Sequence, residues 1–176
     1  MPPLYILRHG ETVWNRSGRL QGTLNSPLTA LGQVQAARQG AILRRIVSLR
    51  CNVQISPQGR ARQTAALAGL TGRMKEGLRE IGLGDWEGRL ISELEPPPGV
   101  LWKFTAPGGE DAASAEARVA HFLAELTGPT IVVTHGVTSI LLRARTLGTP
   151  RSGWDAMDDP QGVVHWIENG RETLLR

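Results

Sequence analysis

The sequence predicts an α/β fold, a three-layer α/β/α sandwich in which helices cover both faces of a mostly parallel central sheet. Short apolar runs alternate with amphipathic helical segments, a pattern typical of strand–helix–strand units. Two of these runs, Leu4-Tyr-Ile-Leu-Arg and Thr130-Ile-Val-Val-Thr, are each followed directly by a histidine and a glycine. Near the C-terminal end, Asn169-Gly170 stands between two further apolar runs and predicts an antiparallel hairpin.

Length and composition predict a single globular domain over residues 1–176. Hydrophobic residues make up 40% of the chain and charged residues 20%, which argues against extensive disorder. The one cysteine, Cys51, excludes an internal disulfide bond and argues against a thiolate zinc site. No secretory leader precedes the run at Leu4 and no apolar stretch reaches membrane-spanning length, so we expect a cytoplasmic protein without a membrane partner.

The net charge of +4 favours anionic ligands, and arginine supplies nearly all of the positive charge. Lysine occurs only at Lys75 and Lys103. Guanidinium groups match the geometry of phosphate and carboxylate groups. The arginines are spread over several segments and form no basic run of the kind that binds nucleic acid, so no nucleic-acid partner is expected.

In the first half of the chain, the polar stretch from Glu11 to Pro27 predicts an active-site loop. Thr29 can cap the helix that follows it. We expect this helix to bury the stripe Leu31, Val34, Ala41, Ile42 and Ile46. Residues 53–55 alternate as a short strand that ends at Ser-Pro, and the alanine-rich residues 60–70 predict the next helix.

In the second half, residues 78–88 are irregular, and the proline-rich residues 96–99 predict a loop. A helix follows Asp111 and ends before Gly128; its apolar face holds Val119, Phe122, Leu123 and Leu126. Another helix follows Gly136, with the stripe Val137, Ile140, Leu141, Ala144 and Leu147. The two remaining histidines, His121 on the first of these helices and His165 in the terminal hairpin, are expected to be structural residues.

The two histidines that follow the apolar runs, His9 and His135, are the main candidates for chemistry. Polar side chains at the carboxyl ends of neighbouring parallel strands meet at the edge of an α/β sheet where ligands bind. Gly10 and Gly136 would let the backbone turn there and let a ligand approach closely. A neutral imidazole can accept a phosphoryl group as a nucleophile, and a histidine can instead act as a hydrogen-bond clamp.

Arginines accompany these histidines. Arg8 precedes His9, and Arg60 and Arg62 stand at the start of a predicted helix, where free N–H groups and the helix dipole favour anions. This set of side chains fits a tetrahedral oxyanion better than a neutral ligand. Glu80, in an apolar sequence context, is a candidate acid for protonating a leaving alcohol.

The run Arg8-His9-Gly10-Glu11-Thr12, with Trp14-Asn15, resembles the signature of the histidine phosphatase superfamily, which includes the cofactor-dependent phosphoglycerate mutases. The resemblance continues in the family's order to about Leu147, and the terminal hairpin is compatible with it. Its further motifs are Leu20-Gln-Gly22, Pro27-Leu-Thr29, Gly32, Gln35-Ala36, Ser56-Pro57, Arg60-Ala61, Gln63-Thr64-Ala65, Leu78-Arg-Glu80, Gly84-Asp-Trp86-Glu-Gly88, Pro107-Gly-Gly-Glu110 and Val133-Thr-His135-Gly136.

The resemblance implies a role for each candidate. His9 would be the nucleophile and become phosphohistidine, and Glu80 would protonate the leaving group and later activate water. Arg8, Arg60 and His135 would hold the phosphoryl oxygens. The positions that it implies for substrate binding are Asn15, Gln21, Gly22 and Gly136. It implies no metal ion and no other cofactor.

Some positions depart from the family's pattern. Asn25 stands where an aspartate is usual, Gln58 where leucine is frequent, and Asp111 where many relatives have serine. None of them is a catalytic position, so they bear on substrate preference or loop packing.

We expect hydrolysis of a small phosphorylated metabolite. The similar mutases carry a longer, basic insertion between the positions of Glu80 and Pro107, whereas residues 89–106 here offer only Arg89 and Lys103 as cations. A mutase must exclude water while its substrate reorients, so a short lid suits hydrolysis. Several lid residues are apolar and would form a wall for the substrate or simply pack.

A phosphoglycerate mutase and a protein that binds phosphate esters without turnover are the alternatives. A metal hydrolase is disfavoured because neither His9 nor His135 has a second ligand at helical spacing. The sequence does not name the substrate. It is compatible with a homodimer but does not determine the oligomeric state.

Overall fold

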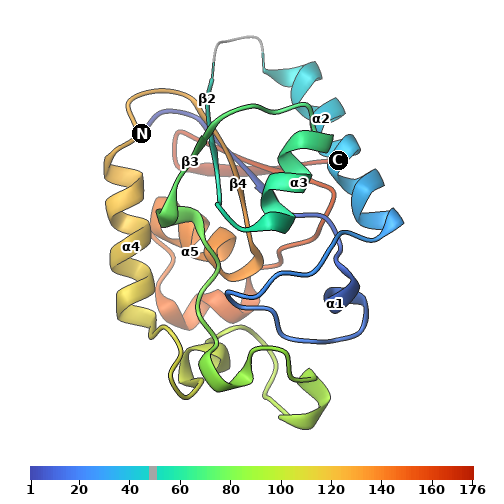
Figure 1. Cartoon of the computed structure of the whole chain (residues 1–176). Helices are drawn as coiled ribbons and strands as arrows, with labels where there is room; N and C mark the ends of the chain where they lie inside the picture. The colour runs from blue at the N-terminus through green and yellow to red at the C-terminus, as the bar shows by residue number, and fades with distance from the viewer. Residues whose placement is uncertain (48–50) are drawn as a thin grey trace.

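The computed structural model describes residues 1–47 and 51–176 and shows a six-stranded sheet between two pairs of helices (Figure 1). The strands are β1 (Leu4–Arg8), β2 (Asn52–Ile55), β3 (Arg73–Met74), β4 (Thr130–Thr134), β5 (Val164–Glu168) and β6 (Arg171–Leu175). The helices are α1 (Val13–Arg16), α2 (Ala30–Ile46), α3 (Gly59–Leu67), α4 (Ala112–Ala124) and α5 (Gly136–Leu147). The strand order is β3-β2-β4-β1-β5-β6; the first four of these are parallel and the C-terminal pair is antiparallel. The predicted fold class is confirmed.

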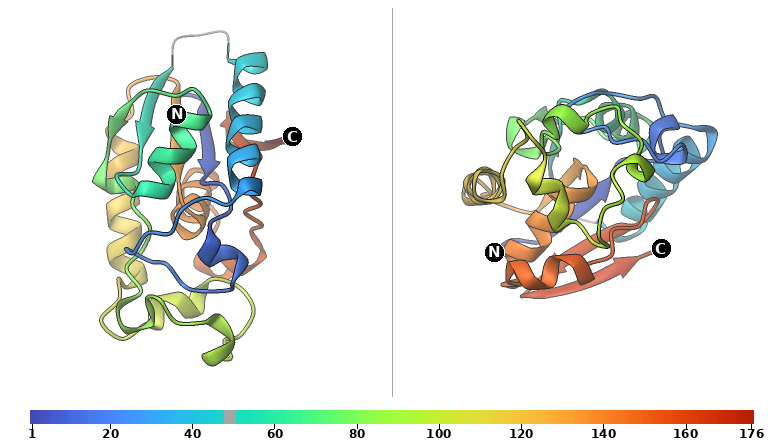
Figure 2. Two further views of the ribbon diagram at one scale, coloured as in Figure 1. Left: turned by 45° about the vertical axis from the view of Figure 1, so that its right-hand side comes forward. Right: turned by 90° about the horizontal axis from the view of Figure 1, so that it is seen from below.

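Alternation along β1 sends successive side chains into two separate apolar cores. Leu4 and Ile6 pack with residues of α4 and α5, whereas Tyr5 and Leu7 pack with residues of α2 and α3. Figure 2 shows α2 and α4 on opposite sides of the sheet. Because helices cover both faces of β1, its sequence is apolar at nearly every position.

The adjacency of β1 and β4 decides where a ligand can bind. The two strands pair in parallel with Arg8 opposite Thr134. The core contacts place α2, the long helix after β1, on one face of the sheet and α5, which follows β4, on the other. A crevice forms at the carboxyl ends of adjacent strands whose following helices lie on opposite faces. The residues directly after β1 and β4 are therefore side by side at this crevice.

Thr29 caps α2 as predicted, but the predicted apolar stripe of this helix is largely wrong. Leu31 and Val34 are 54% and 65% exposed, and Ile46 is exposed at the last residue of the helix. The buried positions are Gly32, Ala36, Gln39, Gly40, Ile42 and Leu43. Close approach of α3 selects this face, since a Cβ atom on Gly40 would lie 2.2 Å from the carbonyl oxygen of Ala68. Small residues, rather than bulky apolar ones, make the contact possible.

Other differences from the sequence-based prediction are local. The helix α1 forms inside the predicted loop because Thr12 and Asn15 cap each other's backbone N–H groups in a capping box. The short strand β3 is absent from the prediction, and α3 ends at Leu67 rather than at residue 70. The predicted hairpin is confirmed, with φ of 51° at Asn169 and 72° at Gly170, as its two-residue turn requires.

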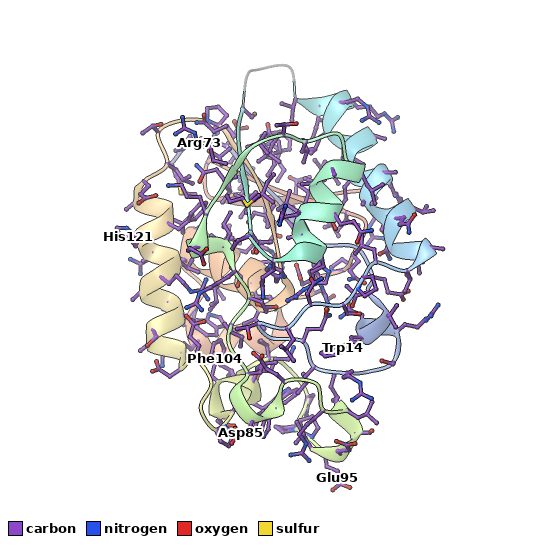
Figure 3. The ribbon with its side chains drawn as sticks, viewed as in Figure 1. Trp14, Arg73, Asp85, Glu95, Phe104 and His121 are labelled. Atoms are coloured by element: carbon purple, nitrogen blue, oxygen red, sulfur yellow. The ribbon has the colours of Figure 1, made fainter. Side chains whose placement is uncertain are left out.

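Residues 89–106, called the lid below, lie beyond the carboxyl ends of the parallel strands, at the lower end of the molecule in Figure 1. Figure 3 shows Phe104 there, with Asp85 from the preceding segment nearby. This part of the chain is built from short 3-10 helices, at Gly84–Trp86, Ile91–Glu93 and Leu101–Thr105; two others lie at Glu76–Leu78 and Arg151–Ala156. Within the described residues, no helix combines the length and the apolarity needed to cross a membrane.

Candidate active site

The two strand-terminal histidines meet at the crevice. The backbone N–H of His9 donates to the carbonyl oxygen of Thr134 at 2.9 Å, which continues the β1–β4 pairing by one residue. The ring centroids of His9 and His135 are 5.2 Å apart, and the residues are only 3% and 0% exposed. Adjacent parallel strands thus bring together two side chains that are far apart in the sequence.

The ring of His9 has a defined hydrogen-bonding state. Its Nδ1 lies 2.8 Å from the carbonyl oxygen of Gly10, which can only accept, so Nδ1 carries the proton. On the other side, Nε of Arg60 donates to Nε2 of His9 at 3.2 Å, so Nε2 offers its lone pair. Burial lowers the pKa of His9 well below its usual value, and the charges of Arg60 and Arg8 lower it further, against the opposing Gly10 hydrogen bond. The ring is a neutral imidazole with its lone pair on Nε2.

His135 lies behind this ring at the start of α5. Its Nε2 is 2.6 Å from the hydroxyl oxygen of Ser56, and its Nδ1 has no hydrogen-bond partner among the described residues. Burial lowers the pKa of His135 well below its usual value, and the positive charge of Arg60 acts in the same direction. Sequence reasoning identifies Ser56 only as part of a Ser-Pro motif and not as a partner of His135.

Arg60 comes from the first turn of α3 and is 1% exposed. Its Nη1 donates to the carbonyl oxygen of Leu24 at 2.7 Å, and its Nη2 donates to that of Gly22 at 2.9 Å. Burial lowers the pKa of Arg60 to about 10, partly opposed by Glu80 and Glu87, so the group stays cationic at neutral pH. The loop before α2 and the first turn of α3 therefore fix this cation against His9.

The backbone conformation of this loop favours glycine at position 22. Its φ is 52°, in the left-handed region, and a Cβ atom would lie 2.2 Å from a carboxylate oxygen of Glu87. Two residues that depart from the family's pattern support the same region. Asn25 Oδ1 accepts from the backbone N–H of Arg60 at 2.8 Å. The side-chain amide of Gln58 joins Gly22 to Glu80: its Nε2 donates to the carbonyl oxygen of Gly22, and its Oε1 accepts from the backbone N–H of Glu80, each at 2.8 Å. The third departure, Asp111, caps α4 instead.

Arg8, at the end of β1, lies across the crevice mouth. Its Nη1 donates to the backbone carbonyl oxygen of Asp159 at 2.6 Å, and its Nε is 3.6 Å from Oδ2 of the same residue. The guanidinium packs on Gly136, where a Cβ atom would lie 3.4 Å from Cζ of Arg8. Asp159 is missed by sequence reasoning, because no motif surrounds it.

Glu80 lies against the N-terminus of α5. Its Oε2 accepts from the backbone N–H of Val137 at 3.1 Å, and its Oε1 accepts from both the N–H and the hydroxyl of Thr138 at 3.1 Å. The apolar neighbours in sequence, Leu78 and Ile81, are fully buried in the core. The expected apolar surroundings of the carboxyl group are thus not what the structure shows: the carboxyl group lies among hydrogen-bond donors.

A cleft of about 380 Å³ joins the predicted catalytic groups except His135, which is fully buried behind His9 and does not line it. The sequence-predicted residues that line it are Arg8, His9, Asn15, Gln21, Gly22, Arg60, Glu80 and Gly136. Two further cations line it: Lys103, a lid cation identified from the sequence, and Arg19, to which the sequence motifs give no role. Arg62, predicted beside Arg60, is exposed and does not line the cleft. Arg89 pairs with Glu93 at the surface, with Nε and carboxylate oxygen 3.5 Å apart.

Asn15, Gln21 and Gln161 add polar groups to the wall of the cleft. The amide N of Gln161 donates to the carbonyl oxygen of His9 at 3.0 Å and to Oδ1 of Asn15 at 3.3 Å. Gln21 is buried, and its Oε1 has no hydrogen-bond partner in the described parts of the chain. In residues 1–47 and 51–176, no group of three or more His, Cys, Asp or Glu side chains is arranged to hold a metal ion.

The fold and the cleft define an α/β protein with buried histidine and arginine side chains at its topological switch point. Residues 4–174 match the sequence profile of the histidine phosphatase superfamily (branch 1). The chain belongs to this superfamily, as its motifs predict.

Named relatives agree with this assignment. Glucosyl-3-phosphoglycerate phosphatase of Mycobacterium tuberculosis is 31% identical over 189 residues, which cover 94% of this chain and 83% of the relative. The probable phosphoglycerate mutase GpmB of Salmonella paratyphi C is 32% identical over 169 residues, covering 85% and 77%. The crystal structure of TTHB049 from Thermus thermophilus superposes with a TM-score of 0.79 at 35% identity and covers 98% of both chains.

Proposed function

We propose that this protein is a metal-independent phosphomonoesterase that acts on a small phosphorylated metabolite through a phosphohistidine at His9. The tautomer of His9 carries the proposal: the Gly10 carbonyl fixes the proton on Nδ1, and Nε2 presents its lone pair beside Arg60. A nucleophilic histidine must be neutral, and burial together with Arg60 and Arg8 lowers its pKa.

In the first step, Nε2 of His9 attacks phosphorus and the bond from phosphorus to the ester oxygen breaks. Arg60 and Arg8 supply cationic donors to the phosphoryl oxygens, and we assign the remaining donor role to His135. Glu80, in its acid form, gives its proton to the departing alkoxide. In the second step, Glu80 takes a proton from water, which attacks the phosphohistidine and releases phosphate with His9 restored.

Asn15, Gln21, Gly22 and Gly136 are assigned to the binding of phosphate or substrate because all of them line the cleft. Gly136 leaves room for Arg8, and Gly22 offers its carbonyl oxygen to Arg60. Asn15 keeps its amide N–H groups for a ligand, since its oxygen accepts from Thr12 N and Gln161.

The lid supports hydrolysis over mutase activity. Of its two cations only Lys103 lines the cleft, because Arg89 pairs with Glu93 away from it. A glucosyl-3-phosphoglycerate phosphatase is among the relatives. The similarity to a probable phosphoglycerate mutase keeps mutase activity as the second candidate.

The test is turnover of an aryl phosphate in the presence of a chelator. We expect hydrolysis by the wild type, its loss in His9→Ala, and normal activity in the matched control His121→Ala, whose side chain is 80% exposed on α4. Bisphosphate-dependent interconversion of phosphoglycerates would instead support a mutase. Tight binding of phosphate esters with no turnover would contradict an enzyme of either kind.

A further inference from the structure

Asp159 buries a carboxylate directly behind the cleft. Its side chain is 4% exposed and belongs to the segment between the last 3-10 helix and β5. Oδ1 accepts from the hydroxyl of Ser139 at 2.7 Å and faces Nη1 of Arg143 at 3.8 Å and Nε2 of His165 at 3.5 Å. A buried carboxylate is costly without such compensation, so its placement calls for a physical explanation.

The other side of Asp159 faces Arg8. Oδ2 of Asp159 and Nε of Arg8 are 3.6 Å apart, both are buried, and neither has a hydrogen-bond partner among the described residues. The backbone carbonyl of Asp159 accepts from Nη1 of Arg8 at 2.6 Å. Asp159 therefore contacts two nitrogens of the rigid, planar Arg8 guanidinium, and two contacts on a planar group restrict its orientation.

We propose that Asp159 is a positioning residue, which holds the Arg8 guanidinium so that its remaining N–H groups meet the phosphoryl group. The proposal rests on the function proposed above and adds a residue that acts only through Arg8. Arg8 is 26% exposed at the cleft and would otherwise lose side-chain entropy on binding its ligand. Prior fixation by Asp159 reduces that cost.

The terminal hairpin anchors Asp159 from behind. Glu172 of β6 accepts from Nε of Arg143 at 2.6 Å and contacts Nδ1 of His165 at 2.6 Å. Arg143 and His165, so held, are the groups that face Asp159. The antiparallel end of the sheet is thereby connected to the cleft through side chains rather than only through strand pairing.

The arrangement predicts a pH dependence. Burial raises the pKa of Asp159, opposed by Arg8, by the Ser139 hydrogen bond, and by His165 and Arg143. Lys103 of the lid lines one cavity together with Arg8 and Asp159, so its charge also lies near this carboxylate. As pH falls and the carboxyl group is protonated, Arg8 loses its ionic partner and phosphoryl affinity decreases.

The test compares Asp159→Asn with Asp158→Asn, which removes the same charge from an exposed neighbour. The readouts are the calorimetric affinity for inorganic phosphate and kcat/KM for an aryl phosphate. We expect both to fall about tenfold in Asp159→Asn, as for loss of an ionic partner 3.6 Å from the guanidinium, and less than about twofold in Asp158→Asn. An unchanged affinity in a folded Asp159→Asn would overturn the proposal.

A double-mutant cycle separates positioning from a general structural role. In an Arg8→Met background, Asp159→Asn is expected to change kcat/KM less than about twofold, whereas an equal tenfold loss in both backgrounds would overturn the proposal. If Asp159→Asn does not fold, Ser139→Ala is used in the same cycle, with a smaller loss in the same direction.

The pH dependence is tested by the ratio of wild-type to Asp159→Asn phosphate affinity, in which the titration of the ligand cancels. This ratio should approach one as pH falls, and a constant ratio would contradict the pH dependence.

Phosphate affinity needs no turnover, so the two proposals fail separately. A wild type that binds phosphate but hydrolyses no ester contradicts the proposed function, and the cycle is then measured with phosphate affinity in place of kcat/KM. A wild type that hydrolyses esters with no coupling between Asp159 and Arg8 contradicts only the positioning role.

Discussion

At the scale of single residues, the chemistry depends on neighbours that fix the state of a ring. His9 has an acceptor on one side, the Gly10 carbonyl, and a donor on the other, Nε of Arg60. Only one neutral tautomer satisfies both. Burial lowers the pKa of both His9 and His135, and the charge of the same arginine lowers both further, so both rings are neutral beside one buried cation.

Replacement of Arg60 by lysine should lower kcat/KM about 100-fold, because an ammonium keeps the charge but cannot make the directed bonds of the guanidinium to His9, Gly22 and Leu24. Steady-state kinetics with an aryl phosphate measures this effect. Arg62→Lys, two residues along on the exposed face of α3, is the control and should keep wild-type rates. Equal rates in the two variants would contradict the assignment of Arg60.

The buried histidines also predict how stability depends on pH. The folded protein lowers the pKa of His9, so below about pH 6.5 the unfolded chain binds more protons and stability is lost as pH falls. His9→Asn should flatten this dependence, and the difference from the wild type should grow as pH falls below about 6.5. Urea unfolding over this pH range measures it. A slope in His9→Asn equal to that of the wild type would contradict a buried neutral ring.

Among the helices and the lid, close packing decides which residues are buried or reach the cleft, and apolar periodicity alone does not. The contact between α2 and α3 depends on Gly40, which the apolar pattern of α2 does not reveal. The buried Gln39 on the same helix donates to the carbonyl oxygens of Arg8 and Val163, so a polar residue supports the end of β1. The lid contributes one cation to the cleft, Lys103, from a 3-10 helix.

Gly40→Ala should destabilise the protein by about 1–3 kcal/mol, because the added methyl group would overlap the backbone of Ala68. Val34→Ala on the same helix is the comparison, and it should change stability by less than about 0.5 kcal/mol because Val34 is 65% exposed. Denaturant unfolding gives both values. A larger loss of stability in Val34→Ala than in Gly40→Ala would instead support the apolar stripe that the sequence predicts for α2.

Lys103→Met should raise KM for a phosphate ester severalfold with little change in kcat, since the ammonium adds attraction for the anion and takes no part in bond making. The other lysine provides the control: Lys75 pairs with Glu125 at the surface, and Lys75→Met should leave both constants unchanged. A fall in kcat with KM unchanged would contradict a binding role for Lys103.

At the scale of the whole molecule, the topology places the site. Parallel pairing of β1 and β4 and helices on opposite faces create one crevice, and the His-Gly pairs after both strands made this edge predictable from the sequence. Arg60 and Glu80 were identifiable because each lies in a short motif, Arg60-Ala61 and Leu78-Arg-Glu80.

Contributions from segments without a motif were not predictable. Asp159 and Gln161 reach the site from the stretch before β5, and only the folded sheet shows that this stretch passes beside Arg8 and Asn15. The donor-rich surroundings of Glu80 depend on where α5 begins in space, which its sequence neighbours do not encode.

Rapid-quench labelling with a radiolabelled phosphate ester, followed by mapping of the label, shows whether His9 is phosphorylated during turnover. We expect an acid-labile, transient phosphoryl group on His9, absent in His9→Ala and present in the His121→Ala control. A competent enzyme that carries the label on another residue, or that turns over without any covalent label, would contradict this expectation.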